Sequence, residues 1–298
     1  MDGTLYVVAT PIGNMGDILL RALGLLRDTK IIIAEDSRKA HHLLSHHGIP
    51  SKDKQFLIYN DHSTDFDRIK ILKLLSPQNH RRSNIVLLTD AGTPLISDPG
   101  YKLVKLLAEH GVCMSQIPGP CAAIAGLALS TMPTNRFMFC GFLPSSKNAR
   151  RKVFTSLKQH PTTLIFFETA KRLCKTLQDL LYTLGNRKIC VAREMTKIYE
   201  EYKRGEAQDV LAHYQLHEPK GEIVLVVTGN GNQTDTEQIQ PYGILDALIE
   251  SGVTPKQATS AILKAFPNLR LNKRELYQRS IKLKNTESLT NQPPNTSQ

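Results

Sequence analysis

The sequence has 298 residues but contains no long apolar run and no closely spaced pair of cysteines. Because no run approaches 18 apolar residues, we expect no membrane-spanning helix. The five cysteines are widely spaced, and no two are separated by two residues, so the sequence predicts neither a metal clip nor a redox motif. We interpret them as buried free thiols in a reducing cytoplasm. The segment Met1-Asp2-Gly3-Thr4 is acidic and leads into an apolar run, so we also expect no secretory signal.

Acidic residues are missing from one long stretch, since none lies between Glu109 and Glu168. That stretch supplies +6 of the formal net charge of +11, and the chain from Asn268 onwards supplies another +4. A basic excess indicates a polyanionic partner, most often a nucleic acid. A solvated charge run is the simpler interpretation, but the absence of compensating acids weakens it. The candidates for contacts with RNA phosphates are Lys147, Arg150, Arg151 and Lys152.

Short apolar runs alternate with helical patterns over the first 230 residues, which predicts βαβ units and a mostly parallel sheet. Pro118-Gly119-Pro120 interrupts this pattern, so the fold class is α/β with two domains, at residues 1–117 and 118–229. The strands are expected at 5–9, 31–34, 56–59, 85–89, 112–117, 137–139, 163–167, 189–192 and 223–227, with a further one at 199–203.

The rest of the chain is expected to be a polar linker at 230–240 and a small helical domain at 241–284. Three short helical patterns make up that domain, at 241–250, 255–265 and 273–282. Residues 285–298 are rich in Asn, Pro, Ser and Thr, and we expect a disordered tail there.

Three loops rich in glycine and proline, at 9–17, 89–101 and 117–123, follow the expected first, fourth and fifth strands. Because the carboxyl ends of parallel strands meet at one edge of a sheet, the loops predict a shared pocket for a small polar ligand. Simpler interpretations also exist. Asp17 and Asp98 would each cap the helix that follows, and Pro99 suits a first helical position.

Charged residues stand at the ends of other strands and are candidates for proton transfer. Glu35-Asp36 and Asp61-His62 follow the second and third strands, and Glu168 follows one in the second domain. A single acid at such a place is usually a helix cap, and Asp36 suits that role. His42 and His46 share a helix face, but no H-E-x-x-H motif accompanies them, so we expect solvated histidines and no metal site.

The loop sequences resemble those of the bacterial 16S ribosomal RNA cytidine-2′-O-methyltransferase family. The matching motifs are Leu5-Tyr-Val-Val-Ala-Thr-Pro-Ile-Gly-Asn14, Ala34-Glu-Asp-Ser-Arg38, Asp90-Ala-Gly-Thr-Pro-Leu-Ile-Ser-Asp-Pro-Gly-Tyr101, Ile117-Pro-Gly-Pro120, Gly141-Phe-Leu-Pro144, Val191-Ala-Arg-Glu-Met-Thr-Lys197 and Lys220-Gly-Glu222. Tyr59-Asn60-Asp61-His62-Ser63 departs from the family's usual Tyr-His-Glu-His-Asn, and Cys121 stands where serine is common.

The resemblance implies the tetrapyrrole-methylase fold, in which two α/β domains flank a cleft that binds S-adenosylmethionine. It further implies a homodimer whose substrate is the ribose of a decoding-centre cytidine in 16S rRNA of the small ribosomal subunit. The methyl-donor contacts that it implies are Pro11, Asp90, Gly92, Thr93, Pro94, Ile96, Pro120, Cys121, Ala122, Phe167, Arg193 and Gly221.

Methyl transfer to a weakly acidic hydroxyl requires a base or a hydrogen-bond acceptor beside it. The catalytic candidates are Glu35, Asp36, Asp61 and His62, with Glu168 as a further acid. Two other functions remain open on the sequence. One is methylation of a small tetrapyrrole, which would leave the basic stretch without a use. The other is RNA binding in ribosome assembly without any catalysis.

Overall fold

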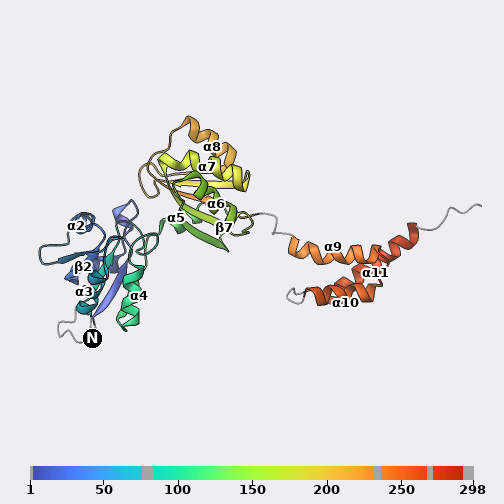
Figure 1. The fold of residues 1–298 in the computed structure, drawn as a ribbon, viewed down its shortest axis with the longest axis horizontal. Coiled ribbons are helices and arrows are strands. Elements are labelled where there is room, and N and C mark those ends of the chain that lie inside the picture. Colours follow the sequence, from blue (N-terminus) through green and yellow to red (C-terminus); the bar gives the residue numbers. More distant parts are fainter. Residues whose placement is uncertain (1–2, 76–83, 231–235, 267–270, 291–298) are drawn as a thin grey trace, which may run out of the picture. The chain divides into compact units, whose positions relative to one another are not determined.

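The computed structural model describes residues 3–75, 84–230, 236–266 and 271–290. The chain divides into two compact units, Met1–Gly229 and Asn230–Gln298 (Figure 1). Within the described residues, the first unit contains two five-stranded sheets and the second contains three helices.

The first sheet is parallel throughout, with strand order β3-β2-β4-β1-β5. Its strands are β1 (Thr4–Val8), β2 (Ile31–Ala34), β3 (Gln55–Ile58), β4 (Ile85–Leu88) and β5 (Cys113–Ile117). These lie within one or two residues of the expected strands, because runs of β-branched and apolar residues suit strands buried on both faces.

Helices cover both faces of the first sheet, and neighbouring residues of one strand point to opposite faces. Ile32 of β2 packs with α1 (Leu20–Asp28) and α2 (Ser37–His46). Ile33 packs instead with α3 (Asp65–Leu75) and α4 (Tyr101–Glu109). The chain after β1 therefore leads to one face and the chain after β4 to the other. This divergence between adjacent strands opens a crevice at their carboxyl ends, where α/β proteins bind ligands.

The second sheet has the order β6-β7-β10-β8-β9 and is mixed, so the prediction of a mostly parallel sheet is wrong here. Only β6 and β7 are parallel neighbours. The strands that a helix connects do run parallel, as strand–helix alternation predicts. However, β10 lies antiparallel between β7 and β8, and that interleaving leaves no local signal. The strands are β6 (Phe137–Phe142), β7 (Thr163–Thr169), β8 (Lys188–Arg193), β9 (Glu201–Glu206) and β10 (Glu222–Val227).

One face of the second sheet carries three helices, α6 (Lys147–Leu157), α7 (Ala170–Leu184) and α8 (Ala207–Leu216). The other face packs against α5 (Ala122–Ala128), which begins at the end of the Pro118–Pro120 segment. The basic stretch was not predicted to be helical, yet it forms α6, whose first turn is capped by the Ser146 hydroxyl. The short 3-10 helix η1 (Met15–Asp17) follows the first loop.

The second unit consists of α9 (Thr236–Glu250), α10 (Pro255–Ala265) and α11 (Lys273–Thr290) around a small apolar cluster. Helix α9 begins within the expected linker, and α11 continues past residue 285, where the tail was expected to start. The remaining part of that tail, residues 291–298, lies outside the described residues. Among the residues that are described, no helix combines the length and apolarity needed to cross a membrane.

Candidate active site

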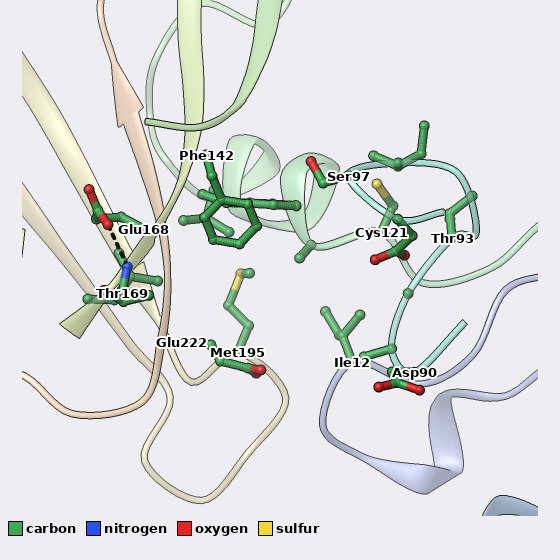
Figure 2. Close-up of a pocket in the computed structure, with 18 of the residues that line it drawn as sticks. Ile12, Asp90, Thr93, Ser97, Cys121, Phe142, Glu168, Thr169, Met195 and Glu222 are labelled. Atoms are coloured by element: carbon green, nitrogen blue, oxygen red, sulfur yellow. Dashed lines mark hydrogen bonds between the residues drawn. The ribbon is translucent and has the colours of Figure 1, made fainter. Parts of the chain in front are cut away.

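A cavity of about 410 Å³ lies where the loops of the first sheet meet the second sheet (Figure 2). The first sheet contributes the segments after β1, β2, β4 and β5. The second contributes the ends of β6 and β7, the turn after β8 and the start of β10. The three glycine- and proline-rich loops predicted to share a pocket therefore do so.

Backbone hydrogen bonds join the first two of these loops. The amide of Thr10 donates to the Gly92 carbonyl at 2.8 Å, and the amide of Gly92 donates to the Thr10 carbonyl at 3.1 Å. Gly92 has a φ of +87°, a conformation that side chains disfavour, which explains glycine there. The Thr93 hydroxyl donates to the Pro120 carbonyl at 3.0 Å and so attaches the third loop. The pocket wall is thus built largely before any ligand arrives.

Two residues other than glycine in the loop after β4 have left-handed backbone conformations, Leu95 at φ 72° and Ser97 at φ 65°. Such conformations are uncommon outside glycine and recur at functional sites. Leu95 packs into the core between the sheet and α4, whereas Ile96 and Ser97 line the cavity. The strained backbone therefore turns Leu95 toward the core and the three residues after it toward the pocket.

Three carboxylates gather on the first-domain wall of the cavity: Glu35, Asp90 and Asp98. The Thr89 hydroxyl donates to Asp98 Oδ2 at 2.7 Å, and Lys39 pairs with Asp90 at 2.8 Å. Burial raises the pKa of Glu35, and the charges of Asp90 and Asp98 raise it further. Burial likewise raises the pKa of Asp98, against the effect of its hydrogen bond from Thr89. This wall attracts a cation and can hold a proton.

The prediction that Asp98 caps the next helix is wrong. Helix α4 begins at Tyr101, and its N-cap residue is Gly100, which has no side chain to cap the helix. The left-handed conformations at Leu95 and Ser97 turn the chain so that Asp98 lines the pocket instead.

The four catalytic candidates end in different places. Glu35 lines the cavity, whereas Asp36 caps α2 by accepting from the Arg38 amide at 2.9 Å. Hydrogen bonds from Arg38 lower the pKa of Asp36 to about 2, which removes it as a base near neutral pH. Asp61 and His62 lie in the turn after β3 and do not line the cavity, although the charge of Asp61 helps raise the pKa of Asp98.

Glu168 is buried at the edge of the cavity, but local groups already engage both of its oxygens. Oε2 accepts from the Thr176 hydroxyl at 2.6 Å. Oε1 accepts from the Thr169 amide at 2.8 Å and pairs with Arg172 at 3.2 Å. These contacts suit a residue that fixes the end of β7 rather than one that accepts a substrate proton.

The second-domain wall includes a turn that touches the first domain. In this turn, Glu194 and Thr196 both have left-handed backbone conformations, with φ of 49° and 64°. Lys197 bridges Glu194 and Glu222 at 3.0 and 2.9 Å. The Met195 side chain projects from this turn into the cavity (Figure 2). A Cβ at Gly13 of the first loop would lie 2.7 Å from the Thr196 hydroxyl, so the two domains approach closely here.

Most of the expected donor-binding residues line this one cavity. They are Asp90, Gly92, Thr93, Ile96, Cys121, Ala122, Phe167 and Gly221. Pro11, Pro94 and Pro120 belong to the same loops but are not part of its lining. Arg193 is directed elsewhere, because it pairs with Glu201 at 2.8 Å and lines a separate hollow.

Sequence reasoning missed several lining residues, namely Ile12, Lys39, Ser97, Phe142 and Met195. All except Lys39 lie inside the motifs that carry the family resemblance, but a motif alone does not show which of its side chains point into the cavity. No cluster of His, Cys, Asp or Glu capable of holding a metal ion occurs in the described part of the chain.

The basic candidates on α6 separate into two kinds. Lys147 and Lys152 are exposed. Arg150 is only 4% exposed and donates to Asp179 at 2.9 Å through Nε, so its placement on an RNA-binding surface needs correction. Arg151 also donates to Asp179, at 2.6 Å, and its guanidinium lies 3.8 Å from the centre of the Tyr182 ring. The two arginines face α7 because Asp179 supplies the acid that their own stretch lacks.

Comparison with known proteins agrees with this geometry. A family model described as Tetrapyrrole (Corrin/Porphyrin) Methylases matches residues 4–211. Among solved structures, the fold resembles the methyltransferase CobJ, with a TM-score of 0.56 and 15% identity over 76% of this chain and 95% of that one. It also resembles diphthine synthase, with a TM-score of 0.53 and 15% identity over 76% of this chain and 89% of that one.

Relatives of higher identity come from bacteria. One from Rickettsia prowazekii is 42% identical over 274 residues, covering 92% of this chain and 94% of the relative. Another from Erythrobacter litoralis is 44% identical over 280 residues, covering 94% and 95%. Both are named ribosomal RNA small subunit methyltransferase I.

The fold is that of a two-domain α/β methylase of the tetrapyrrole methylase class. Within that class, the chain belongs to the ribosomal RNA small subunit methyltransferase I family.

Proposed function

We propose that this protein transfers a methyl group from S-adenosylmethionine to the 2′-hydroxyl of a cytidine in the decoding centre of 16S rRNA. One observation carries the proposal. In a chain of this family, the loops expected to hold the donor and the Glu35–Asp90–Asp98 carboxylates line the same pocket. A pocket of this kind places a cationic donor and a hydroxyl that must lose a proton within reach of the same acidic wall.

The residues present fit S-adenosylmethionine. The cavity volume of about 410 Å³ is in the usual range for sites that bind small molecules. Ile12, Ile96 and Ala122 offer apolar surface, and Gly92 leaves the backbone of its loop open to close approach. The three carboxylates complement a positive charge in a partly desolvated site.

Glu35 is the base in this proposal. The bound donor supplies a methyl group attached to a positively charged sulfur, and positioning then does much of the work. The ribose 2′-oxygen forms the new bond to that carbon as the carbon–sulfur bond breaks, and the hydroxyl proton moves to the Glu35 carboxylate. Burial and the neighbouring acids raise the pKa of Glu35, which makes it a better proton acceptor than an ordinary carboxylate. Asp98 is held in place by Thr89 and maintains that raised pKa.

The exposed bases Lys147 and Lys152 serve to hold RNA phosphates beside the site. Arg150 and Arg151 contribute indirectly, since their contacts with Asp179 fix α6 against α7. The resemblance also implies a homodimer acting in the cytoplasm, and light scattering on the purified protein tests the dimer.

Tritiated methyl transfer tests the proposed function directly. We expect label to enter the 16S rRNA of assembled small subunits, at the ribose of a single cytidine. Transfer to a porphyrinogen in place of RNA would indicate the small-molecule methylase. Binding of RNA without any binding of S-adenosylmethionine, measured by titration calorimetry, would indicate an assembly factor without catalysis.

A further inference from the structure

Phe142 is an apolar ring in a position that folding alone does not explain. It ends β6 on the cavity wall, and its side chain is 56% exposed. The Phe139 and Phe167 rings beside it are better covered, although all three belong to the same aromatic group. An exposed ring in a pocket, rather than on an open surface, indicates a site for a flat apolar ligand.

A β-bulge aims this ring. Phe139 pairs with Ile165, but Phe142 pairs with Phe167, so β6 carries one extra residue between the two pairs. Gly141 within the bulge has a φ of +63°. A Cβ at Gly141 would lie 3.4 Å from the Ser97 hydroxyl, so the bulge also brings β6 against the first-domain loop.

Neighbouring aromatic rings hold Phe142 in place. It packs edge-on against Phe167, with ring centres 5.4 Å apart and planes at 63°. Phe167 packs in the same way against Phe139, at 4.9 Å and 67°. Figure 2 shows the Met195 side chain, from the turn after β8, extending toward the Phe142 ring. Phe142 and Met195 both line the cavity and offer apolar surface to a planar ring that enters it.

We infer that Phe142 is the stacking platform for the cytosine base of the acceptor nucleotide, which enters the pocket drawn out of the RNA. This inference rests on the proposed function and adds the subsite for the base. Sequence-specific recognition of RNA generally uses unpaired bases stacked on aromatic side chains beside basic residues. Phe142 lies five positions before Lys147 on the same segment, so one stretch of chain offers both a stacking surface and a cation for phosphate.

The donor's adenine is the competing partner for the exposed Phe142 ring. The family resemblance assigns the donor to the loops after β1, β4 and β5 and, in the second domain, to Phe167 and Gly221. Phe142 is not among these residues, although it packs against Phe167, and it belongs to the segment leading into the basic helix α6. The acidic wall, where the reacting groups must meet, lies in the first domain. The continuity of Phe142 with the basic helix α6 therefore favours the acceptor base over adenine as the ring that stacks on it.

The chain contains no tryptophan, so Phe142→Trp introduces a single fluorescent reporter at the platform. The reporter is titrated with a short RNA bearing the target cytidine and with the same RNA made abasic at that nucleotide. We expect quenching by the first RNA and little by the second. Quenching of equal size by both RNAs, or by S-adenosylhomocysteine alone, would overturn the inference.

Kinetics on small subunits gives an independent readout. We expect Phe142→Leu to raise the KM for subunits roughly 5- to 150-fold, the usual effect of one base–aromatic stack, with unchanged donor affinity. Phe142→Tyr should restore the KM, because the ring is kept. Phe66→Leu is the matched control, since Phe66 is an exposed ring on α3 outside the pocket.

An unchanged KM in Phe142→Leu would contradict the inference while leaving the proposed function intact. A wild-type protein that transfers no methyl group would instead contradict the proposed function, and the reporter titration would still show whether a base stacks.

Discussion

The hydroxyl oxygen of Thr196 accepts a hydrogen bond of 3.0 Å from the backbone amide of Asn14. Asn14 lies in the loop after β1 of the first sheet and Thr196 in the turn after β8 of the second, and Gly13 beside Asn14 packs against the same turn. This contact fastens the loop after β1 to the turn that carries Met195. The two walls of the pocket are thereby held at a fixed separation.

Loss of that hydroxyl should weaken donor binding. For Thr196→Ala we expect about a 5-fold increase in the Kd for S-adenosylmethionine, which corresponds to one hydrogen bond of about 1 kcal/mol. Thr196→Ser keeps the acceptor and should restore the wild-type Kd. Titration calorimetry measures both, and Thr155→Ala on the exposed face of α6 is the control. Equal binding by the alanine and serine variants would show that the contact does not shape the pocket.

Glu35→Gln should lower activity and raise stability at neutral pH. The fold raises the pKa of Glu35, so the folded state holds its proton more tightly than the unfolded state does. That contribution to stability is present below the unfolded-state pKa, which is near the ordinary value of 4.5, and is lost as pH rises through the raised pKa. The variant should therefore unfold at higher urea than wild type at pH 7.5, with no such advantage at acid pH.

The same variant tests the base. Loss of a general base typically lowers the rate about 10²- to 10⁴-fold. Single-turnover methyl transfer to small subunits measures this loss, and donor affinity measured alongside separates catalysis from binding. His62→Ala, which removes a side chain outside the cavity lining, should keep most of the activity. Full activity in Glu35→Gln would exclude it as the base.

Substitution of Arg150 on α6 should change the stability of the fold, whereas substitution of Lys152 should change RNA binding. Arg150→Met removes one partner of a buried ion pair and should cost about 3 kcal/mol of unfolding free energy. Lys152→Ala changes an exposed side chain and should alter stability by less than about 0.5 kcal/mol. It should instead reduce the salt dependence of RNA binding by about one phosphate contact. Urea unfolding and binding measured across a salt series distinguish the two effects, and a Lys152→Ala variant with an unchanged salt slope would remove this residue from the RNA surface.

Two helical glycines offer a matched pair. A Cβ at Gly126 of α5 would lie 2.9 Å from Val224 Cγ1, so Gly126→Ala should destabilise the second domain by about 1–3 kcal/mol. A Cβ at Gly24 of α1 meets nothing within 4 Å, so Gly24→Ala should stabilise the fold by about 0.5–1 kcal/mol. Thermal unfolding tests the pair. Equal shifts in the same direction would show that helix propensity, and not packing of α5 on β10, dominates at Gly126.

The strands of the first sheet could be predicted because each is a short apolar run between turn residues. The pocket shared by the loops after these strands could also be predicted, because the carboxyl ends of parallel strands meet at one edge of the sheet. The position of β10 could not be predicted, because its pairing with β7 and β8 is a long-range choice. The burial of Arg150 depends on Asp179, 29 residues further along the chain, and no local pattern reveals that pair.

Backbone conformation limited prediction at the site itself. The Asp98-Pro99 pair resembles a helix start, but left-handed residues before it direct the carboxylate into the pocket. Phe142 became a pocket residue only through the bulge at Gly141. In both cases the local backbone conformation decides where the side chain points, and hydrophobic periodicity does not record that conformation.

The central position of β10 also determines when the second sheet can finish folding during synthesis. Strands β7 and β8 leave the ribosome before β10 does, so their facing edges wait unpaired until residues 222–227 emerge. Pairing over such sequence separations is slow and exposes strand edges to wrong partners. Because β10 also supplies Ile223 and Val224 to the cavity, a nascent chain can have a finished first sheet and still have no complete pocket. Binding of the methyl donor therefore has to await the last strand of the second sheet.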